Sequence, residues 1–453
     1  MRGPGACQSV GIMLWLLLPS AGPFAEEAVS PSEGETRTLA SLGIKGEVLF
    51  KSYTYFEDAP ADDRLYREEG ILLLEWSRQF APWVGAKLVG ELRGDTDGDA
   101  NGVYFEVPDT NRHRSILSLR EGTVSLLRAP VDVTIGKQFF AWGTADAYNP
   151  TDNINPYDYM DLDVEKMAVY SVAARVQAGP TTLVAAVVPV FTPSRLPEAT
   201  SRWAPPPPPG VFAVVRDREV PGVEVANVQL AARVRTTLGG WDLSASYYQG
   251  FEDVPEFRAA TITAPSGLVV TSLTPVFPRI SAVGMDFSTT VRGIEVHGEG
   301  AFKFVEKNGR EDQFQAIGGF TYTWDGIDSP WLDAVTLTLE YAREVALRIR
   351  DASILQSGGG ESALGDLLAF NAFQNTLVGR LLLKISEDTQ IKLTGNLNFA
   401  GPTSYYAQVA VTHRFSDAFQ AEAGLDFLGG DARSFWGRWA SNDRVFVVLR
   451  YLF

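Results

Sequence analysis

The sequence has little cysteine, little histidine and no long apolar run, and each shortage excludes a class of protein. With one Cys and three His in 453 residues, disulfide scaffolds and His- or Cys-based metal sites have almost nothing to draw on. A polytopic helical membrane protein needs several apolar runs of about 20 residues. Lys and Arg number 39 against 55 Asp and Glu, whereas a nucleic-acid binder is expected to be basic. Disorder does not fit a chain that is 45% hydrophobic and 11% aromatic.

The apolar run Val10–Leu18 follows Arg2 and precedes small residues that end at Ala25. A basic start, a short apolar core and small residues at the exit predict a secretory signal peptide at residues 1–25. The alternative, a membrane anchor, needs about 20 apolar residues. Cys7 would leave with the signal, so the mature chain would have no disulfide. Residues 26–42 are polar and predict a periplasmic linker.

Beyond residue 42 the chain alternates polar and apolar side chains with a period of two. In Gln390–Phe399 one face carries Gln, Lys, Thr and Asn, and the other carries Ile, Leu, Gly and Phe. Phe314–Trp324 and Asn227–Thr237 repeat the pattern. Such alternation indicates strands with one polar and one apolar face. A soluble sandwich and a membrane barrel both remain compatible with it.

The connections between these strands favour the barrel. Every second connection is tight, and most of the others are long, which is the arrangement of short periplasmic turns and long outer loops in outer-membrane barrels. We therefore predict an all-β protein, in which residues 43–453 form one transmembrane antiparallel β-barrel in the outer membrane of a Gram-negative bacterium. About eighteen strands are expected, with sixteen as the alternative. They are expected at 43–56, 66–80, 83–93, 114–127, 131–142, 168–178, 181–191, 227–238, 241–251, 278–291, 293–305, 312–325, 332–347, 372–386, 389–399, 404–416, 418–428 and 443–453.

Tryptophans occur at one end of the predicted barrel. Trp83, Trp241, Trp324 and Trp331 fall at the expected periplasmic turns, and amphipathic aromatics collect at membrane interfaces. The last strand alternates apolar residues up to Phe453, which resembles the C-terminal signal by which such barrels are recognised for insertion. The expected partners are thus the barrel-assembly machinery, outer-membrane lipid and lipopolysaccharide, and no nucleic acid.

The polar faces would line a lumen, and a barrel of 16 to 18 strands leaves an aqueous channel. The connection at 143–167 is rich in acids, and its two Asn-Pro pairs predict defined turns. We expect it to fold inward and narrow the lumen, because charged rings are a common selectivity device. An exposed acidic surface loop is the alternative. The expected constriction acids are Asp146, Asp152, Asp158, Asp161 and Asp163, facing the lumen-wall residues Arg233, Arg235, Arg380, Lys384, Gln138 and Trp142.

A series of short motifs precedes and enters this connection. In order they are Arg120–Val124, Ile135–Gln138, Trp142-Gly143, Asn149–Asp152 and Asn155–Asp158. The series resembles a poorly characterised family of porin-type outer-membrane barrels near the alginate-export barrels. The resemblance implies a barrel and transport. Alginate itself would need a strongly basic lumen, and the mixed charges here disfavour that substrate.

The sequence contains two further candidate sites. Asp95, Asp97, Asp99 and Glu106 have the spacing of calcium ligands, but Ala100 stands where a glycine is expected. A solvated acidic loop is the alternative, and no other cofactor is expected. No nucleophile elbow, phosphate loop or dinucleotide motif occurs, and His297 alone could serve a lumenal hydrolase, so we predict that the protein is not an enzyme.

The predicted function is a channel for diffusion of small hydrophilic solutes, filtered by the loop at 143–167. The alternative is a carrier of hydrophobic compounds, or a scaffold barrel around a periplasmic partner. The sequence leaves the substrate, the ion selectivity and the number of subunits open.

Overall fold

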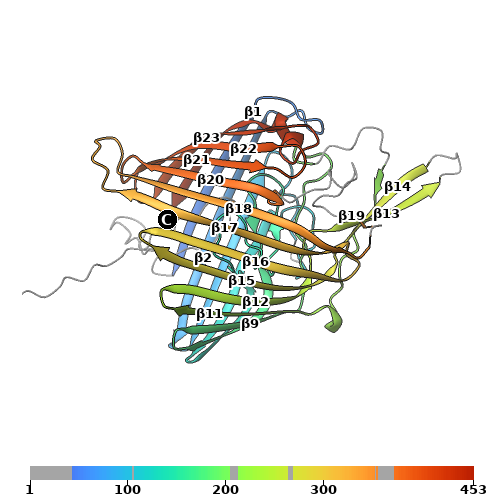
Figure 1. Cartoon of the computed structure of the whole chain (residues 1–453), viewed down its shortest axis with the longest axis horizontal. Coiled ribbons are helices and arrows are strands. Elements are labelled where there is room, and N and C mark those ends of the chain that lie inside the picture. Colours follow the sequence, from blue (N-terminus) through green and yellow to red (C-terminus); the bar gives the residue numbers. More distant parts are fainter. Residues whose placement is uncertain (1–42, 105–106, 205–212, 264–268, 352–353, 356–371) are drawn as a thin grey trace, which may run out of the picture.

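The computed structural model describes residues 43–104, 107–204, 213–263, 269–351, 354–355 and 372–453 (Figure 1). The predicted signal peptide and linker at 1–42, and Glu106 of the calcium hypothesis, lie outside the described residues. Within the described part of the chain, no helix is long and apolar enough to cross a membrane.

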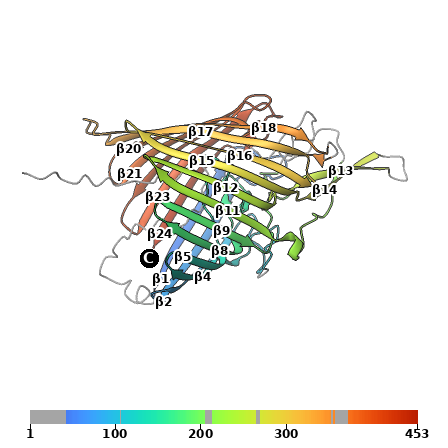
Figure 2. The ribbon, with the colours of Figure 1, turned by 60° about the horizontal axis from the view of Figure 1, so that its bottom comes forward.

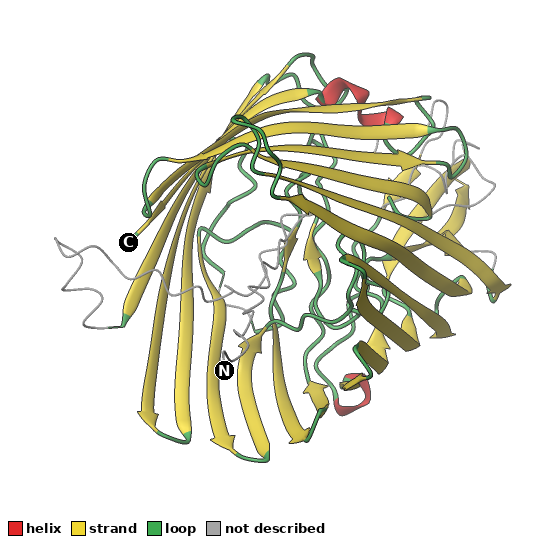
Figure 3. Ribbon diagram, turned by 60° about the vertical axis from the view of Figure 1, so that its left-hand side comes forward, coloured by secondary structure: helices red, strands yellow, loops and turns green. Residues whose placement is uncertain are grey.

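Eighteen antiparallel strands form one sheet, and each strand pairs with the next along the chain. The sheet closes on itself because the first strand pairs with the last, as Figures 1 and 3 show. The prediction of an all-β barrel is confirmed, with eighteen strands rather than sixteen. The barrel strands are β1 (Ile44–Tyr55), β2 (Tyr66–Ala81), β3 (Val84–Asp95), β4 (Leu117–Arg128), β5 (Val131–Gln138), β8 (Val169–Ala178), β9 (Thr181–Val188), β11 (Gln229–Leu238), β12 (Trp241–Phe251), β15 (Arg279–Val291), β16 (Ile294–Lys307), β17 (Glu311–Asp325), β18 (Ala334–Ile349), β20 (Asn375–Lys384), β21 (Thr389–Asn398), β22 (Ser404–Arg414), β23 (Phe419–Gly430) and β24 (Arg444–Leu452).

The closing pair extends to the last residue. Glu47 is opposite Leu452, and Gly46 and Phe453 exchange backbone hydrogen bonds of 2.7 and 2.9 Å. The Phe453 ring lies over Gly46, where an added Cβ would come within 2.1 Å of the ring. Glycine at position 46 therefore lets the terminal ring cover the seam.

The two faces of the wall differ as the alternation predicts. On β3, Leu88 and Leu92 are exposed on the outside, whereas Val89 and Glu91 are buried on the inside. Trp83, Trp241, Trp324 and Trp331 are all exposed at the end of the barrel that carries the tight turns, called the turn end here. An outward apolar surface bounded by aromatic side chains is the surface that outer-membrane barrels bury in lipid.

The long connections at the other end, the loop end, contain strands that the sequence analysis assigned to loops. Four of them form a small sheet in the order β10-β14-β13-β19, which projects from the loop end in Figures 1 and 2. The expectation of plain loops at 192–226, 252–277 and 348–371 was wrong here, because short segments in all three connections pair with one another. The bounds are β10 (Ala213–Val215), β13 (Glu256–Thr263), β14 (Val269–Val276) and β19 (Ile354–Leu355).

The remaining elements are short. Inside the connection at 143–167, β6 (Tyr157–Asp158) pairs with β7 (Glu165–Lys166). Two 3-10 helices, η1 (Val225–Asn227) and η2 (Gly437–Asn442), lie at the loop end.

Candidate functional site

The barrel encloses a cavity of about 1520 Å³. Its lining includes Gly240 and Gln420 near the turn end, and Trp203 and Glu256 at the loop end. The cavity thus follows the barrel axis between the two ends. Much of its lining comes from the segment 143–167, and loops cross the interior of the barrel in Figure 3.

The first part of this segment, the first limb (143–151), is attached to the wall formed by β16 and β18. Glu340 accepts hydrogen bonds of 2.8 Å from the backbone N–H groups of both Asp146 and Ala147. Glu299 accepts one of 3.2 Å from the N–H of Ala145 and one of 2.7 Å from the Thr151 hydroxyl. Two wall carboxylates therefore hold the backbone of the first limb.

Asp146 also meets one of its predicted partners. Arg380 Nη2 lies 2.7 Å from Asp146 Oδ2. Burial raises the pKa of Asp146, and the nearby guanidinium of Arg380 opposes that shift without cancelling it. The structure thus brings together one predicted constriction acid and one predicted wall base.

The neck of the segment is fixed by Asn155, a member of the second Asn-Pro pair. Its side-chain oxygen accepts the N–H of Phe140 at 2.7 Å, and its amide donates to the carbonyl of Met167 at 2.8 Å. The amide of Gln138, a predicted wall residue, donates to the Ser171 hydroxyl at 2.9 Å. Lys166 contacts Asp152 across the same neck. These contacts give the segment a defined shape.

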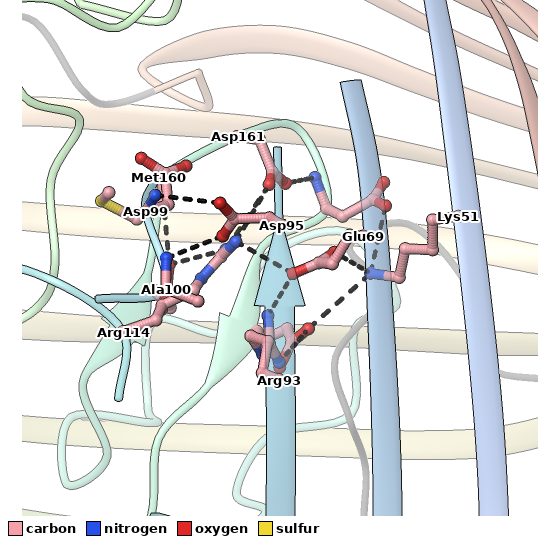
Figure 4. A network of polar contacts seen from close by, with 12 residues as sticks. Lys51, Glu69, Arg93, Asp95, Asp99, Ala100, Arg114, Met160 and Asp161 are labelled. Carbon is pink, nitrogen blue, oxygen red and sulfur yellow. Dashed lines mark hydrogen bonds and ion pairs between the residues drawn. The ribbon is translucent and has the colours of Figure 1, made fainter. Parts of the chain in front are cut away.

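The second limb (156–167) lies against the opposite wall, formed by β1 to β4 (Figure 4). Arg114 Nη2 is 2.9 Å from Asp158 Oδ1, and Arg67 Nη1 is 2.8 Å from Asp161 Oδ2. Wall acids join in, because Glu69 contacts Arg93 at 2.8 Å and Arg114 at 3.3 Å. We call the whole set the lumenal ion-pair network: Lys51, Arg67, Glu69, Glu91, Arg93, Arg114, Arg120, Asp158, Asp161, Asp163 and Glu165.

The acids of the second limb are held in their charged form. Burial alone would raise the pKa of Asp158, but Arg114 and Arg195 outweigh it and lower the pKa. Burial is likewise outweighed at Asp161, where Arg67 and Arg114 lower the pKa. The pKa of Asp163 is also lowered, because Lys51 and Arg444 overcome the effect of burial. Opposite charges within about 4–6 Å favour the ionised form in this way.

Three of the four predicted wall bases do not meet the loop acids. Arg233 Nη2 binds Asp286 on β15 at 2.9 Å, and Arg235, with 56% of its side chain exposed, pairs with Asp242 at 3.1 Å. Lys384 is exposed at the turn end of β20. Arg233 and Arg235 line the cavity, as predicted for the lumen wall, but they pair with acids on nearby strands. Lys384 lies beyond the loop. Trp142 is buried, and the Arg233 guanidinium lies 6.0 Å from its ring.

Most of the bases that hold the second limb come instead from the first four barrel strands and the connection before β4, and Arg195 and Arg444 add contacts to Asp158 and Asp163. The predicted site residues do not include Lys51, Arg67, Arg93, Arg114 and Arg120. The signal available was the repeated occurrence of Arg and Lys beside Glu on the polar faces of these strands.

The calcium hypothesis concerns a segment whose described carboxylates have other partners. Asp95 accepts the backbone N–H groups of Gly98 and Ala100 at 2.6 and 2.7 Å, and Asp97 pairs with Arg67 at 3.0 Å. Burial raises the pKa of Asp99 to about 6. Within the described residues, no three His, Cys, Asp or Glu side chains are grouped as metal ligands.

His297, the candidate for a lumenal hydrolase, supports the first limb. Its Nε2 lies 2.7 Å from Glu340 Oε1, the same oxygen that accepts the N–H of Asp146. His297 therefore orients a carboxylate that holds the loop.

Comparisons with known proteins bear on the fold. No family model matches the chain, and no curated protein matches it. Among solved structures, the chain is similar to OccK11 (OpdR) of Pseudomonas aeruginosa, with 10% identity, a TM-score of 0.50, and coverage of 90% of this chain and 95% of that one. It also matches a mutant porin of Rh. blastica and a loop-deletion mutant of the outer-membrane protein OmpT of Vibrio cholerae. Both have 10% identity and a TM-score of 0.40, and the matches cover 90% of this chain and 99% and 98% of theirs.

The predicted likeness to the alginate-export barrels stays a prediction. At 10% identity the match with OccK11 establishes the fold alone. Together with the closed eighteen-strand sheet, it shows that this chain folds as an antiparallel β-barrel, whose outer surface is apolar.

Proposed function

We propose that the protein is a channel through which small hydrophilic solutes diffuse across the outer membrane. The observation that carries this proposal is the cavity along the barrel axis, whose lining reaches from Gly240 and Gln420 to Trp203 and Glu256. Barrels of this strand number leave room for water inside. The lining includes carboxylates, bases, amides and tyrosines, and such a surface suits hydrated solutes.

The filter of this channel is the segment 143–167. Its two limbs contact opposite walls through Glu340 and Arg114, so a solute must pass beside it. Buried ion pairs hold the second limb, which favours a fixed constriction over a mobile flap. Charged side chains at a constriction select solutes by charge and size.

The first test is conduction. We expect the purified protein, reconstituted in a planar lipid bilayer, to give discrete conductance steps in KCl, because the lumen is polar and continuous. Swelling of vesicles that contain the protein in solutions of neutral sugars of increasing size would give the size limit. A protein that inserts, as judged by protease protection, but never conducts would contradict the proposal.

The two alternative functions, a scaffold barrel and a carrier of hydrophobic compounds, predict different results with the same purified protein. A scaffold barrel would copurify with a periplasmic protein and conduct only without it, and a carrier of hydrophobic compounds would bind them without conducting ions. Recognition of Phe453 by the barrel-assembly machinery and contact with lipopolysaccharide stay predictions.

A further inference from the structure

The segment 143–167 has two unlike surroundings. Its second limb lies against β1 to β4, where acids and bases alternate and are buried. There, Arg93 contacts three carboxylates, Glu69, Glu91 and Glu165, at 2.8 to 2.9 Å. Charges so closely matched leave little net field for a passing ion.

The other side, at the loop ends of β12 and β16 to β18, is short of bases. Five carboxylates line the cavity there, namely Glu252, Asp253, Glu256, Glu311 and Glu344. Of the described lining bases, Lys303 lies among them. Lys166 of the segment itself contacts Asp152 and lies 5.6 Å from the Tyr157 ring. Lys303 Nζ lies 3.1 Å from Glu252 Oε1. Arg310, just outside the lining, has its Nε 3.5 Å from Glu311 and donates its backbone N–H to Glu256.

Three tyrosines of the segment face the same side. The hydroxyl of Tyr148 donates to Gln315 at 2.8 Å, and the amide of Gln315 donates to Glu344 at 2.7 Å. The rings of Tyr157 and Tyr159 lie 5.8 Å apart, and all three tyrosines line the cavity. Aromatic faces beside carboxylates form a surface that attracts organic cations.

A separate observation also indicates a missing donor. Asp152 lines the cavity with 2% of its side chain exposed, and Lys166 contacts one of its oxygens. None of the described residues donates a hydrogen bond to the other oxygen, Oδ1. A buried acceptor of this kind calls for a donor from a solute or from water.

Burial raises the pKa of two of these carboxyls, and the nearby bases do not offset it. Burial, and then the charge of Glu252, raise the pKa of Asp253 to about 6. Burial, with added repulsion from Glu252 and Glu311, raises the pKa of Glu256 to about 8. A cation that enters beside these groups would relieve their mutual repulsion and favour their ionised forms.

We propose that the permeation path runs along the β12–β18 side of the segment 143–167 and selects small organic cations, such as amines and quaternary ammonium ions, over anions. The proposal rests on the channel function above and names its substrate class. Carboxylates raise the local concentration of cations, and the tyrosine rings contact their organic part.

Two bilayer measurements test the wild-type protein. In a KCl gradient, we expect the reversal potential to correspond to a permeability for potassium on the order of tenfold higher than that for chloride. This is the lower end of the range by which a charged cleft raises the local concentration of counter-ions. With choline chloride on one side of the bilayer and KCl on the other, choline should carry current. The ratio of choline permeability to potassium permeability should exceed the ratio of the two mobilities in water. A preference for anions, or exclusion of choline, would overturn this proposal. A protein that conducts in these experiments would still support the channel function proposed above.

A matched pair of variants locates the path. Glu252 pairs with Lys303 at 3.1 Å on the proposed path, and Glu422 pairs with Lys392 at 3.3 Å on the wall across the lumen. Each of the two substitutions to Gln removes one lining carboxylate and leaves one lysine without its ion-pair partner. We expect E252Q to lower the potassium preference at least threefold more than E422Q, since a charge acts most strongly on ions beside it.

Equal effects of the two variants would show a general lumenal charge and would overturn the assigned path. E344Q is the second variant, for the case in which E252Q does not insert. It should also lower the cation preference more than E422Q does.

Discussion

Replacing residues 146–163 with a short Gly-Ser linker should raise the single-channel conductance several-fold. The replaced part contains most of the first limb, attached to Glu340, and most of the second limb, attached to Arg114. It also removes residues that line much of the cavity. A linker can close the gap because Gln138 and Val169, at the ends of β5 and β8, are paired in the sheet. The wall arginines would then be solvated by lumenal water.

The control variant shortens a connection that lies outside the lumen. Shortening the connection 326–330 between β17 and β18 changes a turn at the opposite end of the barrel, and none of these residues lines the cavity. It should leave the conductance unchanged. If the truncation of 146–163 also leaves conductance and size limit unchanged, the segment is not the constriction.

The strands could be predicted from sequence because their signals are local. Alternation sets the two faces, and turn residues such as Gly239 and Gly240, both with positive φ, mark the tight connections. The hairpin of β13 and β14 could not be predicted in this way, because it lies in a connection expected to be a loop. Its strands pair with each other and with β10 and β19 rather than with the wall.

The partners of the loop acids could not be predicted in the same way. Asp146 and Arg380 are 234 positions apart, and their pairing depends on the path of the loop through the lumen. Arg233 was assigned to the loop because its position faces inward, which is correct. Its guanidinium binds Asp286 directly, two strands away on the same face, and Ser244 on the strand between them contacts both side chains. An inward position in a strand thus predicts access to the lumen but does not predict the partner.

The substitution Arg114→Gln should destabilise the protein far more than Arg235→Gln. Arg114 has 3% of its side chain exposed and contacts Glu69, Asp158 and Asp161. Removing one partner of a buried ion pair costs about 3–5 kcal/mol, because the remaining charges stay buried. Arg235 pairs with Asp242 and is largely exposed, and such surface pairs contribute about 0–1 kcal/mol. The free energy of unfolding, from urea titrations in lipid vesicles, measures both.

The pH dependence of the two variants tests the origin of this effect. In the wild type, the lowered pKa of Asp158, where Arg114 and Arg195 outweigh burial, contributes stability above the ordinary Asp pKa of about 3.9. That stability is lost as the pH falls through the lowered value. In Arg114→Gln, Arg195 alone opposes the effect of burial, so the pKa of Asp158 should rise relative to the wild type. The stability gained as the pH rises above the ordinary Asp pKa should therefore be smaller in this variant. If Arg114→Gln and Arg235→Gln lose the same free energy of unfolding at every pH, the lumenal ion-pair network stabilises the loop no more than a surface ion pair does. The proposal of a fixed constriction would then have no physical basis.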